Sequence, residues 1–413
     1  MQSIPFNPAD PRTALAQLPT LAAVFALYGE NERAEPYIGR TPNLRARLAR
    51  LLQPSARHPR RLQLAGLVRR IDFRLTGSEF ESLLAQFNLL HEVYREKSLE
   101  RMHLRAPAFV RFLGSNRYPR VVVTHRPSQR EAAWAYGPFA SRAAAERYVD
   151  EALKLFLLRR CVEELEPNPA HPGCVYSEMK MCLAPCYQGC TDERYAEESA
   201  AVEQFFSTRG ESRLVTLRAE RDKASANLEF ETAAALHAQV QSAETVRALA
   251  PELVRPLSRL RAVVLQPSAN AAEVAVFLFE RDRLAGPAAF STVGMRIQNE
   301  QSGSSSLFAH PMAIEPVPEQ PPLEPNPPAV RAARSVLEAR LEEALASLAG
   351  AGEPTATARQ GHLALLKRWY YRPETRRAGE IFFPNGEDAW PLKAILRGIG
   401  RVAAKALQAA PQP

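Results

Sequence analysis

The chain has 413 residues, of which 46% are hydrophobic and 24% charged, and its formal net charge is +8 at pH 7. Such a chain is long enough for two or three domains that each bury a core, and its composition is that of a globular protein. No apolar run reaches the ~18–20 residues that would cross a bilayer, so we expect no membrane-spanning segment.

The positive charge comes mostly from arginine, which contacts phosphate in a bidentate manner and stacks on bases. This excess favours a nucleic-acid partner, although an arginine-rich genome would produce the same bias. The N-terminal residues lack the basic and apolar stretches of a secretory signal, and we therefore expect a cytoplasmic protein. In that compartment, cysteines are more often free thiols or metal ligands than disulfides.

Residues 1–100 have the pattern of a small α/β unit. Asn43 and Ser78 can cap helix N-termini, and each is followed by leucines at helical spacing, which predicts two helices. Short apolar runs bounded by turn residues predict strands at 22–28, 36–39 and 68–75.

Residues 101–195 combine a predicted strand with a helix and a cysteine-rich stretch. The strand is expected at 120–124, a turn at Gly137-Pro138, and a helix from Ser141 to about Leu158. From about 192 to 249 the apolar spacing is helical, which predicts further helices.

The last third of the chain changes character twice. Strand-like runs at 262–265 and 274–278 predict a β-rich segment at 256–312. Seven prolines between 315 and 328 favour an extended linker, which we place at 313–330. Residues 331–413 carry leucines at helical spacing and a basic aromatic stretch, and they predict a helical, basic tail.

All five cysteines fall between Cys161 and Cys190. Four thiolates from one short stretch can enclose a zinc ion or an iron–sulfur cluster. The two Cys-x2-Cys knuckles of a zinc ribbon are missing, and the irregular spacing suits an iron–sulfur cluster somewhat better. The alternative is a set of buried cysteines that act only as small apolar side chains.

The cysteine stretch resembles that of the UvrC family. The similar segments are LFLLRRC at 155–161, PGCVY at 172–176 and MCLAPC at 181–186. The resemblance implies a [4Fe–4S] cluster, with zinc as the alternative, held by Cys161, Cys174, Cys182 and Cys186. Cys190 is additional to that set.

Residues 224–234 resemble the UVR motif of the same family, a helical hairpin that pairs with the UvrB helicase subunit. Placed in a hairpin at 200–250, the motif implies a partner surface at Leu228, Phe230, Ala233 and Ala234. An ordinary helix pair packed within the chain would show the same apolar spacing.

Residues 1–100 resemble a GIY-YIG nuclease domain, through the Tyr-Ile-Gly triplet at 37–39 and the stretch at 77–84. The resemblance implies catalytic positions at Tyr37, Arg40 and Arg47, with Mg²⁺ or Mn²⁺ as cofactor only if the nuclease is active.

Three further positions of this nuclease pattern are substituted. Phe25 stands where the family has a tyrosine, Gln86 where it has the metal-binding glutamate, and Ser98 where it has an asparagine. Phe25 has no hydroxyl to relay a proton, and a neutral amide is a weak ligand for Mg²⁺. Losing two such groups costs many orders of magnitude in rate, so incision is expected to be weak or lost.

The sequence therefore predicts an α+β multidomain protein. The order is a degenerate GIY-YIG-like α/β domain (1–100), a cysteine-rich helical region (101–195), a UVR hairpin (200–250), a small β-rich segment (256–312), a linker (313–330) and a helical tail (331–413).

The resemblance spans roughly residues 15–295 and implies a DNA repair protein that works on damaged DNA with UvrB. The alternatives are an active Cho-like endonuclease and an iron–sulfur or zinc scaffold without a DNA role. The acidic triad of the second UvrC nuclease is not found. Candidate DNA contacts are Arg45, Arg50, Lys367, Arg368 and Arg372.

Overall fold

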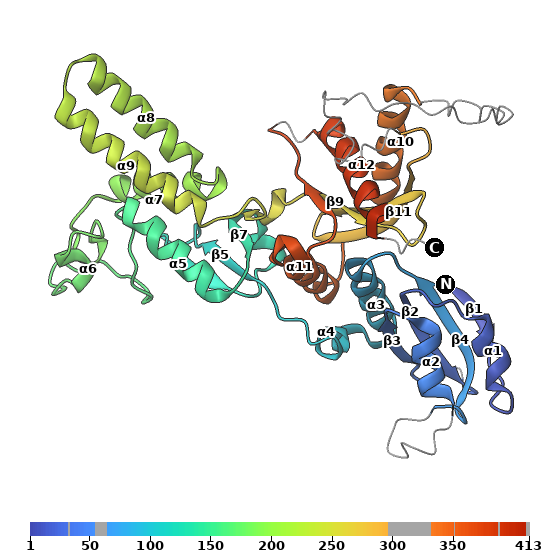
Figure 1. Ribbon diagram of the computed structural model, residues 1–413. Helices are drawn as coiled ribbons and strands as arrows, with labels where there is room; N and C mark the ends of the chain where they lie inside the picture. The colour runs from blue at the N-terminus through green and yellow to red at the C-terminus, as the bar shows by residue number, and fades with distance from the viewer. Residues whose placement is uncertain (32–33, 54–63, 296–331, 351, 387–388, 410–413) are drawn as a thin grey trace, which may run out of the picture.

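The computed structural model describes residues 1–31, 34–53, 64–295, 332–350, 352–386 and 389–409. The described chain forms three small antiparallel sheets with helices packed against them, so the expected α+β class is confirmed (Figure 1). The expected linker at 313–330 lies outside the described residues. Among the described helices, none is long and apolar enough to cross a membrane.

The first sheet contains the Tyr-Ile-Gly triplet. Its strand order is β1-β4-β2-β3. The strands are β1 (Gln2–Pro5), β2 (Ala23–Gly29), β3 (Tyr37–Thr41) and β4 (Val68–Leu75), and the helices are α1 (Pro11–Gln17), α2 (Leu44–Leu52) and α3 (Glu79–Tyr94). The caps are as predicted: the side chains of Asn43 and Ser78 accept hydrogen bonds from the backbone N–H of Ala46 and Glu81.

The second sheet has the order β6-β5-β7-β8. Its strands are β5 (Ala108–Phe112), β6 (Val121–Thr124), β7 (Ala135–Phe139) and β8 (Arg255–Pro256), covered by α5 (Arg142–Ala152) and α7 (Asp192–Ser207). The predicted turn at Gly137-Pro138 is wrong, because both residues lie inside β7. A Cβ at Gly137 would stand 2.6 Å from Cδ1 of Phe109, so this glycine lets neighbouring strand β5 pack closely. The helix predicted to reach Leu158 ends at Ala152 and continues as a 3-10 turn over Leu153–Leu155.

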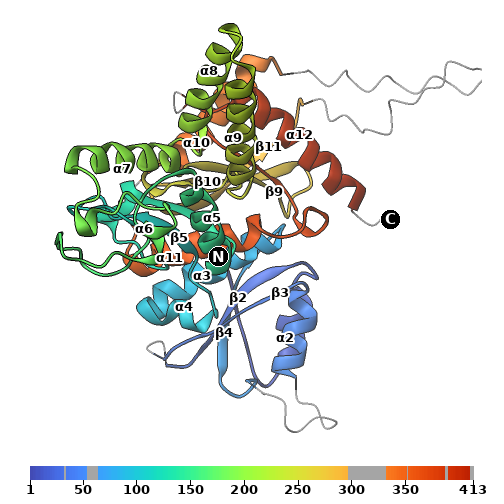
Figure 2. The ribbon, with the colours of Figure 1, turned by 90° about the vertical axis from the view of Figure 1, so that its left-hand side faces the viewer.

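The cysteine-rich region is mostly loop and turn, so the helical character expected of it is limited. Between α5 and α7 it contains one short helix, α6 (Val175–Glu178), and a 3-10 turn at Pro185–Tyr187. The chain then forms a long hairpin of α8 (Glu211–Ala226) and α9 (Phe230–Ala248), which lie side by side in Figures 1 and 2.

The third sheet joins two regions that the sequence analysis separated. Its order is β11-β10-β9-β12, from β9 (Ala262–Pro267), β10 (Glu273–Glu280), β11 (Arg283–Ser291) and β12 (Glu380–Phe382). The expected helical tail therefore contributes a strand. Its helices α10 (Arg334–Leu348) and α12 (Leu392–Ala409) cover one face of the sheet, and α11 (Ala356–Tyr370) covers the other.

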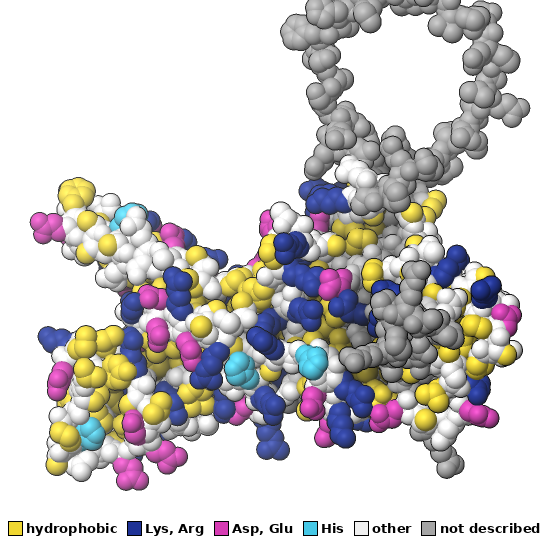
Figure 3. Space-filling model, turned by 60° about the horizontal axis from the view of Figure 1, so that its bottom comes forward, with side chains coloured by type: hydrophobic (Ala, Val, Ile, Leu, Met, Phe, Trp, Pro, Cys, Tyr) yellow, Lys and Arg dark blue, Asp and Glu magenta, His cyan; other side chains and the backbone are white. Residues whose placement is uncertain are grey.

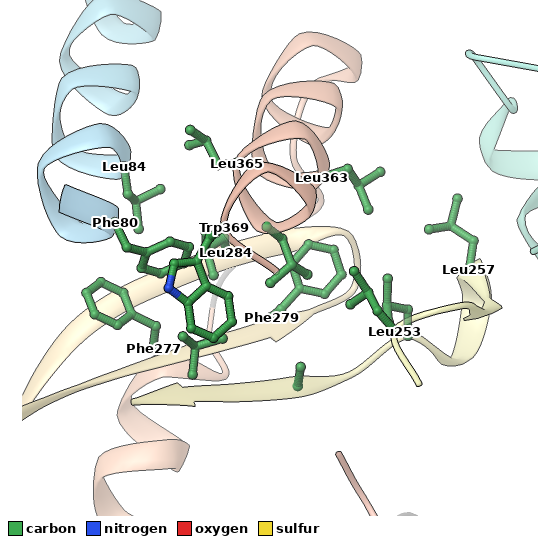
Figure 4. Packing of buried hydrophobic residues seen from close by; sticks show 14 of the residues in the cluster. Phe80, Leu84, Leu253, Leu257, Phe277, Phe279, Leu284, Leu363, Leu365 and Trp369 are labelled. Atoms are coloured by element: carbon green, nitrogen blue, oxygen red, sulfur yellow. The ribbon is translucent and has the colours of Figure 1, made fainter. Parts of the chain in front are cut away.

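Helix α3 connects the first sheet to the third. Figure 4 shows Phe80 of α3 beside Phe277 of β10 and Trp369 of α11, with ring centroids 5.2 and 5.5 Å from that of Phe80. Along the same contact, a Cβ at Gly361 would lie 2.0 Å from Cζ of Phe87. The glycine thus allows α11 to press directly on α3, and the two units share one apolar core.

Candidate functional site

Tyr37, at the start of β3, lies between an apolar and a basic neighbour. Its hydroxyl accepts a hydrogen bond of 3.4 Å from Nη2 of Arg47 on α2. Phe25 on β2 is 1% exposed, and its ring centroid is 6.2 Å from that of Tyr37. Phe25 pairs with Gly39 across the strands, where a Cβ would lie 2.8 Å from Cζ of the ring. The structure thus brings Tyr37, Arg47 and Phe25 together, with an apolar ring beside the tyrosine.

Gln86 is a half-buried residue of α3, the helix that packs against β3. Two contacts bracket it: Glu79 is 3.7 Å from Nη2 of Arg40, and the hydroxyl of Tyr94 donates to the carbonyl of Pro36 at 3.1 Å. Residues seven apart return to the same side of a helix, about 10 Å further along. Gln86 stands in that relation to Glu79, so the carboxylate of Glu79 cannot replace a ligand at position 86.

Glu79 is surrounded by arginines. Arg372, which follows α11, donates through Nη1 and Nη2 to its two carboxylate oxygens at 2.8 Å each. These hydrogen bonds lower the pKa of Glu79, and the positive charges of Arg372, Arg40 and Arg368 lower it further. The carboxylate is therefore ionised but already neutralised by its own chain.

Glu81 and Ser98 serve local structure. Glu81 is buried and accepts a hydrogen bond of 2.8 Å from the backbone N–H of Gly77, and burial raises its pKa. Ser98 is fully buried and donates to the carbonyl of Arg95 at 2.7 Å. Glu81 thus caps the turn before α3, while Ser98 stabilises the turn after it.

The thiols of Cys161, Cys174 and Cys186 each lie within electrostatic range of Cys182. The pKa of Cys182 is raised to about 11, mainly by burial, and the charges of the other three thiols contribute to this increase. Cys190 belongs to a different environment: burial raises its pKa, and the charge of Asp192 adds to this effect. Cys190 thus differs from Cys182 in the charged groups that act on its thiol.

Backbone and side-chain groups surround two of these sulfurs. The N–H of Ala184 lies 3.3 Å from Sγ of Cys182, and Nη1 of Arg159 lies 3.7 Å from Sγ of Cys161. Within the described part of the chain, no group of three or more His, Cys, Asp or Glu residues could hold a single metal ion. An iron–sulfur cluster is larger than one ion and holds its cysteines at separate corners, so it does not require the four sulfurs to meet around a single point as zinc does.

The candidate DNA-contacting side chains differ in their exposure and in their hydrogen bonds within the chain. Arg45 donates to the carbonyls of Leu18 and Ala16 at the end of α1, and Arg50 donates to the carbonyl of Ala46. Lys367 is half-buried, and burial lowers its pKa. Arg368 is exposed and close enough to influence Glu79, so with Arg40 and Arg372 it forms a basic cluster. Figure 3, which views the molecule from the lower side of Figure 1, shows many Lys and Arg side chains across the middle of the face that it draws.

The aromatic part of the basic stretch is core. Trp369 is 4% exposed and its Nε1 donates to the carbonyl of Ala378 at 3.0 Å. It packs on Phe80 in the shared core, so stacking of Trp369 on a base is excluded in this conformation (Figure 4).

The tip of the α8–α9 hairpin exposes two large apolar side chains. Leu228 is 71% exposed and Phe230 is 66% exposed, whereas Leu214, Leu217, Val240 and Ala243 form a buried core lower in the hairpin. Leu228 also has a positive φ of 64°, a conformation that costs an L-residue roughly 1–2 kcal/mol. Of the other two predicted contacts, Ala234 is exposed and Ala233 is half-buried.

Sequence reasoning missed the ion pair of Glu79 with Arg372 and the burial of Arg159. The first joins residues 293 positions apart, a separation that no local pattern reveals. The second had a signal in the Arg159-Arg160-Cys161 step, where a cation directly precedes a proposed metal ligand.

Residues 109–205 match the family described as the UvrC/Cho excinuclease middle domain. This segment contains β6, β7, nearly all of β5 and all five cysteines, whereas β8 of the second sheet lies outside it. Residues 109–205 are therefore similar to a UvrC/Cho middle domain, and the expected resemblance to that family is confirmed.

The chain is also similar to proteins named UvrABC system protein C. The one from Alcanivorax borkumensis is 29% identical over 51% of this chain and 34% of its own length. Those from a Ruegeria species and Pseudomonas protegens are 29% and 27% identical over 59% and 57% of this chain. The chain thus covers only 34–40% of the length of these relatives. No solved structure matches the chain.

Proposed function

We propose that this protein acts in nucleotide excision repair, where it binds damaged DNA together with a UvrB-like subunit and has weak or lost incision activity. One observation carries the second half of this proposal. The nuclease-like site retains its cations, but the carboxylate nearest to them, Glu79, is held by Arg372 and Arg40.

Phosphodiester hydrolysis needs a metal to neutralise charge, a base for the attacking water and cations around the phosphate. Arg40 and Arg47 supply cations, and Tyr37 keeps a hydroxyl that is hydrogen-bonded to Arg47. A carboxylate for Mg²⁺ or Mn²⁺ is missing at Gln86, and Phe25 offers no hydroxyl. The arrangement can hold a phosphate but has little means to cut it.

DNA binding would rely on the basic cluster of Arg40, Arg368 and Arg372. These side chains come from the first unit and from the end of α11, which the α3–α11 contact holds together. Such contacts release counterions from DNA, so affinity would fall steeply with salt. Arg50 and Lys367 remain candidates at the edges of this surface, and Arg45 is engaged with backbone carbonyls.

The UvrB-like partner would dock at the tip of the α8–α9 hairpin. Leu228 and Phe230 are exposed apolar groups, and Leu228 also has a strained backbone conformation, a combination typical of binding surfaces. The similarity to UvrABC system protein C supports this assignment.

We also propose a [4Fe–4S] cluster at Cys161, Cys174, Cys182 and Cys186. The proximity of the other three thiols to Cys182 and the different charged groups that act on Cys190 support it. When bound, a cluster of this kind supplies a one-electron redox centre and cross-links the loops that carry its ligands.

A nicking assay tests the incision part of the proposal. A duplex with a single bulky lesion is incubated with the full chain, UvrB and Mg²⁺ or Mn²⁺, beside a Tyr37→Phe variant. Strand nicks should be indistinguishable between the two proteins. Metal-dependent incision that disappears in Tyr37→Phe would overturn the proposal in favour of an active Cho-like endonuclease.

The same preparations test the DNA part. Binding of the lesion duplex should weaken as salt rises and weaken further in an Arg40→Ala, Arg368→Ala double variant. Binding that is absent at low salt would favour a metal-cluster scaffold with no DNA role.

A further inference from the structure

Arg159 is a charged side chain that the fold places inside the protein. It is 3% exposed, and it precedes Cys161 in the loop after α5. Its backbone N–H donates to the hydroxyl of Tyr195 at 3.2 Å, and that hydroxyl donates to the carbonyl of Pro119 at 2.8 Å. Since Tyr195 is itself buried on α7, this pair fixes the loop and directs the guanidinium inward.

The partners of this guanidinium are neutral or sulfur atoms. Nη1 donates to the carbonyl of Glu163 at 3.1 Å and lies 3.7 Å from Sγ of Cys161. Nε is buried and has no hydrogen-bond partner in the described structure. None of the ion pairs found among the described residues joins Arg159 to a carboxylate, and Glu163 offers its backbone while its side chain is exposed.

A guanidinium stays protonated even when buried, so it cannot neutralise itself as a buried lysine or histidine does. Buried charges in folded proteins are therefore paired or bound to an opposite charge. No carboxylate is found to pair with Arg159 among the described residues. The groups beside it that can carry a negative charge are the cysteine thiols.

The thiols of Cys161 and Cys182 share a neighbourhood with Arg159. All three groups act on the hydroxyl of Tyr195: the two thiols raise its pKa, and Arg159 lowers it. Burial is the largest cause of the raised pKa of Tyr195, which marks this neighbourhood as sheltered from water. A negative charge on the cysteines would thus be felt strongly by Arg159.

We propose that Arg159 is the buried counter-charge of an anionic, thiolate-bound centre at the four cysteines. It acts as a positioning residue, which holds the Cys161 thiolate and raises the reduction potential of the centre. This inference rests on the proposed [4Fe–4S] cluster. Charge and hydrogen bonds near the cluster sulfurs are among the factors that set such potentials.

Arg160 provides a matched comparison on the next residue. It is half-buried, and its Nη2 donates to the carbonyl of Leu153 at 2.8 Å. No contact with a cysteine sulfur is found for it among the described residues. Removing its charge therefore tests whether any nearby arginine has the effect expected of Arg159.

The experiment uses the full chain, purified without oxygen and reconstituted with iron and sulfide. Iron and sulfide content, circular dichroism and the midpoint potential are measured for the natural protein, Arg159→Gln, Arg159→Lys and Arg160→Gln. Loss of the charge in Arg159→Gln should shift the equilibrium at least tenfold toward the oxidised form, about 59 mV for one electron. Arg159→Lys and Arg160→Gln should stay near the natural potential.

The outcomes separate this inference from the assignment of the cofactor. A natural protein that holds no iron and sulfide overturns both. A loaded protein whose potential is the same in Arg159→Gln overturns the counter-charge alone. If Arg159→Gln fails to load, loading of Arg159→Lys supports the inference, whereas failure of both variants overturns it, because the positive charge is then not the property that matters.

Discussion

Glu79 on α3 and Arg372, two residues after the end of α11, form a bidentate ion pair. Both oxygen–nitrogen distances are 2.8 Å. The pair lies at the edge of the core that contains Phe80 and Trp369. It ties the nuclease-like unit to the third sheet and at the same time occupies the carboxylate closest to Arg40.

Breaking this pair should loosen the contact between α3 and α11. Because Glu79 is 42% exposed, the pair contributes about 1 kcal/mol or less. Arg372→Ala should lower the midpoint temperature slightly, and Arg376→Ala, on an exposed neighbour, should leave it unchanged. Since the pKa of Glu79 is lowered in the fold, the contribution is present above its unfolded pKa and is lost as pH falls through the folded pKa. Equal melting of Arg372→Ala and the natural chain at pH 7 would contradict this reading.

A carboxylate at position 86 should restore divalent-metal binding. Gln86→Glu places an anion at a half-buried position of α3, the helix that packs against β3, without removing the ion pair of Glu79. Manganese binding, followed by electron paramagnetic resonance, should rise in this variant and stay unchanged in Asn88→Asp, which adds the same charge at an exposed position of α3. Incision should remain weak because Phe25 still lacks a hydroxyl. If both variants bind the ion equally, Gln86 does not face a metal position.

Leu228 at the tip of the α8–α9 hairpin should lower the stability of the fold but strengthen binding to a UvrB-like protein. Leu228→Asn relieves the left-handed strain and should raise the stability of the hairpin by up to about 1 kcal/mol. The same change removes an exposed apolar side chain and should weaken binding to a UvrB-like protein, measured by titration calorimetry. Val215→Ser is the control, because Val215 is also exposed but lies on α8 away from the tip. Equal weakening by both substitutions would place the interface elsewhere.

The set of cysteine ligands should exclude Cys190. Cys186→Ser is expected to lose bound iron and sulfide, whereas Cys190→Ser should keep both, because Cys190 packs beside the core of the second sheet. Chemical analysis of anaerobic preparations provides the measurement. Loss of iron in Cys190→Ser with an unchanged circular dichroism spectrum would show that the fifth cysteine is a ligand.

His362 should make the α3–α11 contact sensitive to acid. Its pKa is lowered to about 4, mainly by burial, and the charges of Arg283 on β11 and His91 on α3 contribute, while a hydrogen bond to the backbone of Asp282 opposes them. Between about pH 6.5 and 4, His362 is therefore protonated in the unfolded chain but neutral in the folded chain. The free energy of unfolding falls by roughly 3 kcal/mol as the pH is lowered across this window.

His362→Leu should reduce this loss, and His237→Leu, on the exposed hairpin, should not. The measurement is the midpoint temperature of thermal unfolding of the three proteins between pH 7 and 4. Parallel curves for His362→Leu and the natural chain would mean that His362 is not the acid-sensitive group. The half-buried Asp282 has the opposite effect on the pH dependence of stability, since burial raises its pKa, and its contribution is common to both proteins.

Local signals in the sequence predicted local structure well. Asn43 and Ser78 cap helices as expected, because a capping side chain and the apolar spacing behind it are properties of neighbouring residues. The predicted strand at 68–75 is likewise present as β4. The turn expected at Gly137-Pro138 failed because tertiary packing against Phe109 overrides the local preference of the two residues.

Pairings between distant segments could not be predicted in this way. β1 pairs with β4 and β12 pairs with β9, and neither short strand has enough residues for a periodic pattern. At the nuclease-like site, the residue types at 25, 37 and 86 were visible, but the neutralisation of Glu79 depends on Arg372 from the other end of the chain. An ion pair between residues so far apart in the sequence can be recognised only in the folded structure.

Because β12 pairs with β9, a polypeptide that is truncated before β12 is expected to aggregate. Among the described residues, α10, α11 and α12 cover the third sheet and all lie beyond position 331. A polypeptide that stops at 295 would leave β9 as an open edge and expose the apolar side chains of both faces. Nonsense mutations in this part of the gene should therefore produce aggregates and targets for proteolysis, and not a shorter working protein.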